Sequence, residues 1–106
     1  MKILDEILDE KLTLSFEVFP PKTDAAFEEV LKATEEIAAL KPSFISVTYG
    51  AGGKGGKYTM EIARRLQNAD GVETLAHLTC VGAKKDDVQA YLQAMKDAGI
   101  RNIMAL

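Results

Sequence analysis

Hydrophobic and polar residues alternate along this chain with two different periods. Four stretches repeat their apolar residues every three or four positions, as amphipathic helices do. These stretches are residues 2–10, a segment between Thr23 and Lys41, residues 58–69, and a segment from Asp86 to Gly99. Four others alternate in the two-residue period of a strand or are short and apolar: residues 12–20, 44–49, 73–80 and 102–106.

The order of these elements predicts an α/β fold with a parallel sheet. One helix is followed by three strand–helix units and a fourth strand, and the units repeat about every 30 residues. Strands that alternate with helices pair in parallel through right-handed crossovers. No linker or low-complexity segment divides the chain, so residues 1–106 are expected to form a single, partial domain.

The predicted strands have one apolar and one polar face. The apolar set in the first two strands is Phe16, Val18, Ile45 and Val47, and the opposite set is Ser15, Glu17, Ser46 and Thr48. In the third strand, Leu75, His77 and Thr79 share one face. Polar groups therefore gather toward the carboxyl ends of three successive strands, which is where parallel α/β proteins bind ligands.

Two residues on this polar face are candidates for chemistry. Glu17 stands in an otherwise apolar strand, and a carboxyl between two covered sheet faces is suited to act as a general acid. The alternative for Glu17 is an exposed carboxylate on an edge strand, which the alternation makes the less favoured reading. His77 is the single histidine, and either a structural or a functional role fits it. No cluster of residues at metal-ligand spacing occurs, so no metal site is expected.

A glycine-rich loop follows the second strand. Residues 50–55 match G-x-G-x-x-G, the pattern of dinucleotide-binding folds. The helical pattern begins only near Tyr58, and the preceding strand is polar on one face, so we do not assign a Rossmann site. A flexible loop and a loop whose backbone closely approaches a ligand both stay open.

Composition and charge limit the classes of molecule that this chain is expected to bind. The 106 residues carry a formal net charge of −3, and a basic patch that would attract nucleic acid or an anionic membrane is lacking. No apolar stretch is long enough to cross a bilayer. The single cysteine, Cys80, excludes an internal disulfide, and the N-terminus does not resemble a signal peptide. These features lead us to expect a cytoplasmic protein.

Four blocks of sequence, in order, resemble the opening of methylenetetrahydrofolate reductases. They are residues 15–22 (SFEVFPPK), 46–53 (SVTYGAGG), 77–81 (HLTCV) and 99–106 (GIRNIMAL). The resemblance implies the N-terminal part of a (β/α)₈ TIM barrel that uses FAD and NAD(P)H to reduce 5,10-methylenetetrahydrofolate to 5-methyltetrahydrofolate.

The same resemblance assigns roles to individual residues. Glu17 would be the catalytic general acid that helps to open the imidazolidine ring of the folate. The cofactor-binding residues would be Thr48, Tyr49, Ala51, His77 and Leu106, with Thr48 beside the flavin ring. The family often has Ser-Thr-Arg or a similar sequence where this chain has Lys54-Gly55-Gly56-Lys57, so loop contacts made there are not carried over.

The resemblance also predicts how much of the enzyme is present. The family continues past the position of Leu106 with an Arg-Gly-Asp segment, and a complete barrel needs roughly 250 residues. We therefore expect a barrel truncated in its fourth strand and inactive by itself. The alternative is a non-catalytic half-barrel module that forms homo-oligomers through its open sheet edges.

Overall fold

The computed structural model describes residues 3–9, 12–49 and 55–106. Its helices are α1 (Ile3–Asp9), α2 (Phe27–Ala38), α3 (Gly55–Asn68) and α4 (Lys85–Asp97), with a short 3₁₀ turn, η1 (Asp24–Ala26), before α2. Its strands are β1 (Ser15–Val18), β2 (Phe44–Val47), β3 (Thr74–Leu78) and β4 (Asn102–Ala105). The predicted alternation of helices and strands is confirmed.

The four strands form one parallel sheet in the order β1-β2-β3-β4. Each new strand is added to the same side of the preceding one, without the reversal of strand order that defines a doubly wound fold. The chain is therefore an α/β protein whose sheet is consistent with part of an α/β barrel. The strand order likewise lacks the switch point at which a Rossmann fold binds its dinucleotide.

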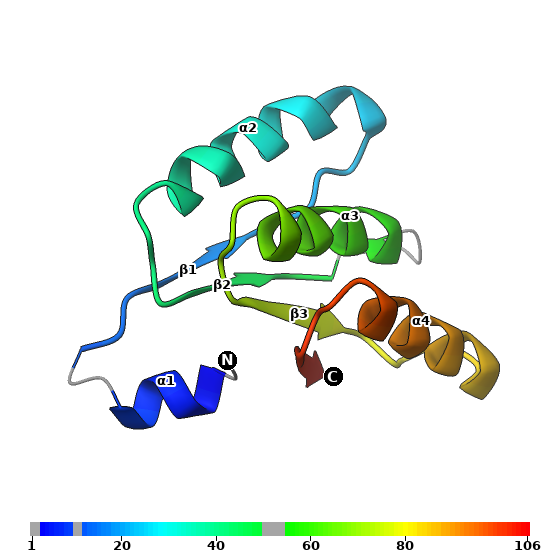
Figure 1. The fold of residues 1–106 in the computed structure, drawn as a ribbon. Coiled ribbons are helices and arrows are strands. Elements are labelled where there is room, and N and C mark those ends of the chain that lie inside the picture. The colour runs from blue at the N-terminus through cyan, green and yellow to red at the C-terminus, as the bar shows by residue number, and fades with distance from the viewer. Residues whose placement is uncertain (1–2, 10–11, 50–54) are drawn as a thin grey trace.

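Helices α2, α3 and α4 cover one face of the sheet, while α1 lies apart from them below the strands in the view of Figure 1. The backbone N–H of Ile3 in α1 donates a hydrogen bond of 3.1 Å to the side-chain oxygen of Asn102, the first residue of β4. Helix α1 is thus attached at the amino ends of the strands, opposite the end where a ligand is expected.

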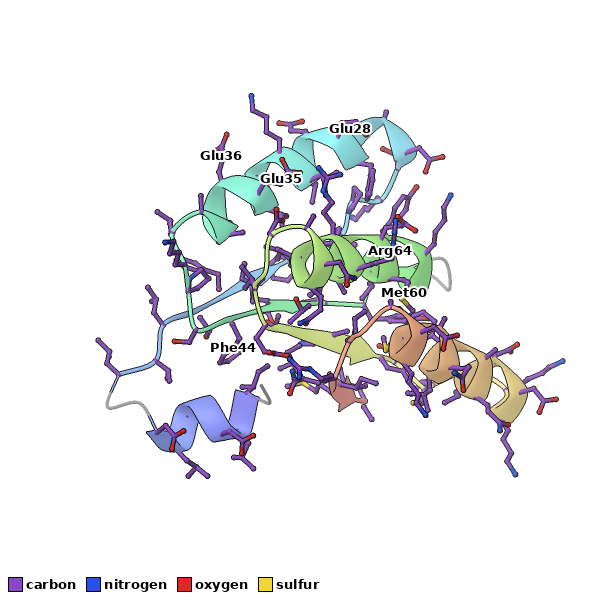
Figure 2. All side chains as sticks on the ribbon, in the orientation of Figure 1. Glu28, Glu35, Glu36, Phe44, Met60 and Arg64 are labelled. Atoms are coloured by element: carbon purple, nitrogen blue, oxygen red, sulfur yellow. The ribbon has the colours of Figure 1, made fainter. Side chains whose placement is uncertain are left out.

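The hydrophobic core lies between the sheet and the three covering helices. The side chains of Ile45, Val47, Ile62, Leu66 and Met95 are completely buried there. Outer-face residues of α2 such as Glu28 and Glu36 point away from this core (Figure 2) and are exposed. The apolar spacing in the sequence therefore selects the buried face of each helix, because only that face is removed from water.

Several helices and strands begin or end at other residues than the sequence predicts. Helix α3 begins at Gly55 rather than near Tyr58, so the predicted late start of this helix is wrong and does not argue against a dinucleotide motif. The short turn η1 precedes α2, and Thr23 forms no side-chain capping bond there. The first strand is shorter than residues 12–20, because its ladder matches the four residues of β2.

Glycines follow two of the helices. Gly71 follows α3 with a φ of 67°, and Gly99 follows α4 with a φ of 81°. Positive φ is accessible to glycine without steric cost, so both turns form readily at these positions. Within the described ranges, no helix has the length and apolar character that a bilayer crossing requires.

Candidate functional site

Three polar side chains from three adjacent strands meet on the sheet face opposite the covering helices. Glu17 of β1 is the register partner of Ser46 of β2, and His77 lies on β3 two residues after Leu75, the partner of Ser46. The Ser46 hydroxyl donates a hydrogen bond of 3.2 Å to Glu17 Oε1. His77 Nε2 lies 3.8 Å from the same oxygen. The predicted polar face is therefore real, and its members converge on one carboxyl oxygen.

Burial differs sharply within this cluster. Ser46 and His77 are 7% and 8% exposed, whereas the Glu17 side chain is 48% exposed. His77 Nε2 is buried and has no hydrogen-bond partner among the described residues. The cluster thus combines a buried serine and a buried histidine with a carboxyl that solvent or a ligand can reach.

The environment of Glu17 differs from the sequence-based expectation. We expected a covered carboxyl, but Glu17 lies on β1 at one edge of the described sheet and is about half exposed. The reason is topological, because all three long helices cover the other face of the sheet (Figure 1). The edge-strand alternative describes its exposure correctly, although its contacts with Ser46 and His77 distinguish it from an isolated surface carboxylate.

Thr48 and Leu106 are held by their backbones at the carboxyl ends of the strands. The Thr48 N–H donates to the carbonyl of Val18, and its own carbonyl accepts a 2.8 Å bond from the Thr59 hydroxyl of α3. The Leu106 N–H donates to the carbonyl of Leu78, which extends the ladder beyond β4. The Leu106 side chain is 58% exposed. Both predicted residues therefore lie at the expected end of the sheet.

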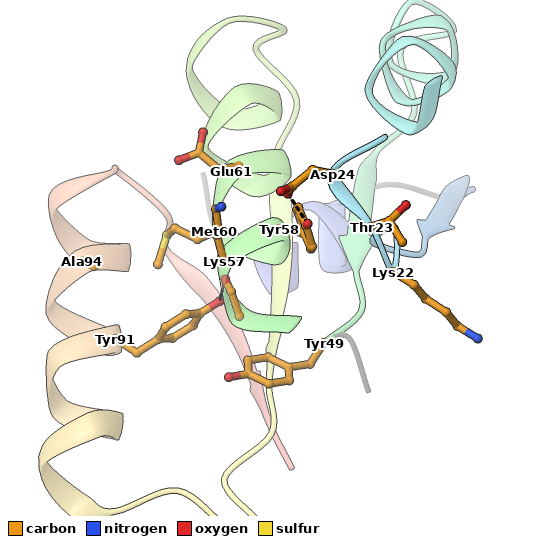
Figure 3. A pocket seen from close by; sticks show the side chains of 11 residues that line it. Lys22, Thr23, Asp24, Tyr49, Lys57, Tyr58, Met60, Glu61, Tyr91 and Ala94 are labelled. Atoms are coloured by element: carbon orange, nitrogen blue, oxygen red, sulfur yellow. Dashed lines mark hydrogen bonds between the residues drawn. The ribbon is translucent and has the colours of Figure 1, made fainter. Parts of the chain in front are cut away.

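The side chain of Tyr49 points toward α4 and not toward the cluster around Glu17. Its ring lies edge-on to the ring of Tyr91 on α4, with centroids 6.0 Å apart (Figure 3). The Tyr91 hydroxyl donates to the carbonyl of Gly56, and burial raises the pKa of that hydroxyl. The Tyr49 side chain therefore lines a pocket between α3 and α4, away from the cluster around Glu17.

Gly56 has a structural role in this arrangement. A Cβ at this position would lie 2.7 Å from the Tyr49 hydroxyl oxygen and 3.1 Å from the Tyr91 ring. The two tyrosines can therefore pack against α3 only because Gly56 has no side chain. Ala51, the remaining predicted cofactor contact, lies outside the described residues.

Sequence reasoning placed Ser46 on the polar face but not in the site. The signal that could have found it is the parallel pairing of the first two strands, which sets Ser46 beside Glu17. No group of three or more histidine, cysteine or acidic side chains suitable for a metal ion occurs within residues 3–9, 12–49 and 55–106.

The fold and this cluster define a class of protein: a parallel α/β protein with a glutamate, a serine and a histidine in contact toward the carboxyl ends of its strands. Residues 2–106 match the family model described as methylenetetrahydrofolate reductase. The chain therefore belongs to the methylenetetrahydrofolate reductase family, and the predicted resemblance is confirmed.

Individual relatives agree with this assignment. The chain is 40% identical over its whole length to methylenetetrahydrofolate reductase (NADH) 1 of Zea mays, covering 18% of that protein. It is 35% identical to the 5,10-methylenetetrahydrofolate reductase of Pectobacterium carotovorum over 93% of this chain and 33% of the relative. The Escherichia coli enzyme of the same name is 34% identical over 91% of this chain and 32% of the relative. The chain thus spans a third or less of each of these relatives.

Proposed function

We propose that this chain forms the first four strands of a (β/α)₈ barrel that reduces 5,10-methylenetetrahydrofolate to 5-methyltetrahydrofolate. NADH or NADPH would supply the electrons through FAD. The observation that carries the proposal is the contact of Glu17 with Ser46 and His77 at the carboxyl end of the sheet, in a member of this family. The folate, the nicotinamide and the flavin would all approach this edge.

The residues present fit a flavin at this edge. His77 Nε2 is buried and unpartnered in the described part of the chain, and such atoms usually find a partner in the functional state. Thr48, His77 and Leu106 would hold the cofactor, together with Tyr49 and Ala51. Since the Tyr49 ring packs on Tyr91, its backbone would make the contact rather than its ring. When bound, FAD supplies hydride transfer between the nicotinamide and the folate.

Glu17 would supply the proton. Opening the five-membered ring of the folate breaks a carbon–nitrogen bond, and the departing nitrogen needs a proton to become a good leaving group. In the proposed step the O–H bond of the Glu17 carboxyl breaks as the new N–H bond forms, leaving a carboxylate. The exposure of the carboxyl allows a substrate to reach it.

The composition of the chain also bears on its compartment and its partners. We infer a cytoplasmic enzyme, since a single cysteine fits a reducing compartment. A net charge of −3 disfavours binding to nucleic acid or to an anionic membrane. The folate and NAD(P)H would be its small-molecule partners, and we expect a homo-oligomer.

The proposal is tested by Glu17→Gln in a full barrel, for example a chimera of this chain with the remaining strands of the Escherichia coli relative. Flavin absorbance follows the two half-reactions separately. Glutamine cannot donate the proton, so folate reduction should fall by roughly 10²- to 10⁴-fold. Reduction of the flavin by the nicotinamide needs no such donor and should persist.

The control is Glu28→Gln, which removes an exposed carboxylate from the outer face of α2. It should leave both half-reactions unchanged. An equal fall of both half-reactions in Glu17→Gln would make Glu17 a structural residue. Full folate reduction by that variant would refute the proposed role of Glu17.

A second function is favoured by one observation. Leu4, Leu8 and Leu12 are 65%, 75% and 82% exposed near the N-terminus. Leu4 and Leu8 lie one turn apart on α1, and adjoining large apolar side chains are seldom left in water. A half-barrel module that self-associates would cover them without any catalysis. Flavin binding distinguishes the two functions, because the reductase needs a flavin and the self-associating module does not.

A further inference from the structure

We propose that Ser46 is the positioning residue of the acid, and that Glu17 delivers its proton from Oε2 rather than Oε1. This inference rests on the proposed function, and it adds a residue and an atom to it. Three observations carry it: the pairing of Glu17 with Ser46, the burial of Ser46, and the convergence of two groups on Oε1.

The pairing makes Ser46 a rigid anchor. Ser46 lies in β2 between two neighbouring strands and is only 7% exposed, so both its backbone and its side chain are confined. Glu17 lies in the edge strand, and half of its side chain is exposed. The mobile partner is therefore the glutamate, and the 3.2 Å bond from Ser46 restricts the rotamers that its carboxyl can adopt.

In the proposed arrangement, the hydrogen bond with Ser46 selects the oxygen of Glu17 that carries the transferable proton. A neutral carboxylic acid has one carbonyl oxygen, which accepts, and one hydroxyl oxygen, which donates. Ser46 donates to Oε1, and His77 Nε2 faces the same oxygen at 3.8 Å. When Oε1 is the carbonyl oxygen that accepts the serine bond, the proton of the acid is on Oε2. Oε2 forms no hydrogen bond with the described residues.

We expect the hydrogen bond from Ser46 to affect the rate of proton transfer more than the stability of the fold. A proton donor must lie within about 2.6–3.2 Å of the atom that it protonates. A displacement of about 1 Å can cost on the order of 100-fold in rate. Without Ser46, the exposed Glu17 side chain would distribute over several rotamers, and Oε2 would seldom face the substrate nitrogen.

The experiment compares three variants in the same chimera, with the two half-reactions measured separately. Ser46→Ala should lower the rate of folate reduction by roughly 10- to 100-fold, with little change in flavin reduction. Ser46→Thr keeps the hydroxyl and should recover most of that loss. Ser15→Ala is the matched control, since it removes an exposed hydroxyl from the same face of β1 two residues before Glu17. It should leave both half-reactions unchanged.

A second measurement uses the 106-residue chain itself and no enzyme activity. Carbon-13 relaxation of the Glu17 side chain should show faster internal motion in Ser46→Ala than in the wild-type chain and in Ser46→Thr. Equal motion in all three, or an equal loss of folate reduction in Ser46→Ala and Ser46→Thr, would overturn the inference. So would full activity of Ser46→Ala when Glu17→Gln is inactive. Full activity of Glu17→Gln would instead overturn the proposed function.

Discussion

The two faces of the β-sheet have opposite properties, and neighbouring residues of β2 show the difference. Ile45 faces the helices, is fully buried, and belongs to the hydrophobic core. Ser46, the next residue, faces the other way and contacts Glu17. Since successive side chains of a strand point to opposite faces, one strand of four residues contributes to both the core and the site.

The residues that stabilise the fold and the residues of the candidate site therefore lie on opposite faces of the sheet. Core residues on the helix side are held by many apolar contacts, whereas the residues of the site make few and specific polar contacts. The helix side is closed by α2, α3 and α4 (Figure 1), and the other side leaves Glu17 accessible. Substitutions on the two faces should therefore affect different measurements.

The largest effect is expected from Ile45→Ala. Removing a fully buried side chain leaves a cavity and should lower the free energy of unfolding by about 2–5 kcal/mol. Ser46→Ala removes one hydrogen bond to a half-exposed partner and should cost about 1 kcal/mol or less. Urea unfolding of the chain, followed by circular dichroism, measures both. Equal losses would show that the two faces are not energetically distinct.

An intermediate effect is expected from the exposed apolar side chains near the N-terminus. The isolated 106-residue chain should self-associate through them, and Leu8→Lys with Leu12→Lys should weaken association at least tenfold, since burying a lysine charge is unfavourable. Val81→Lys is the control, because Val81 is 85% exposed but follows β3 at the other end of the sheet. Sedimentation equilibrium gives the dissociation constants. A wild-type chain that stays monomeric at high concentration would contradict this prediction.

The smallest effect is expected at Asp70, in the turn between α3 and β3 and away from both faces. Burial, and to a lesser degree the charge of Glu35, raise the pKa of Asp70 against the opposing charge of Arg65. The folded state therefore keeps a proton that the unfolded state releases, and stability falls as pH rises from about 4 through the folded pKa. At neutral pH the penalty is fully present.

Asp70→Asn removes this penalty, so it should raise the free energy of unfolding slightly at pH 7, by less than about 1 kcal/mol. It should bring no gain below the unfolded pKa of 3.8. Thermal unfolding of both proteins across this pH range checks the sign. A variant that is less stable at pH 7 would mean that the Asp70 carboxylate has a favourable partner there.

Local patterns in the sequence were enough to predict the elements and their faces. The periods of apolar residues identified four helices and four strands, because burial of one face requires that periodicity. The same alternation placed Glu17, Thr48 and His77 near the carboxyl ends of their strands. Helix starts were less predictable: α3 begins at Gly55, since a helix already anchored by Thr59 and the core tolerates glycine in its first turn.

Contacts between distant residues were decided only by the tertiary structure. The strand order and register brought Ser46 next to Glu17 and left the Glu17 carboxyl half exposed, and neither fact follows from alternation within one strand. Packing of α4 against α3 likewise turned the Tyr49 ring toward Tyr91. A sequence determines which side chains share a face through local geometry. Which of them meet depends on pairing between segments about 30 residues apart, where the free energy of the whole core selects the register.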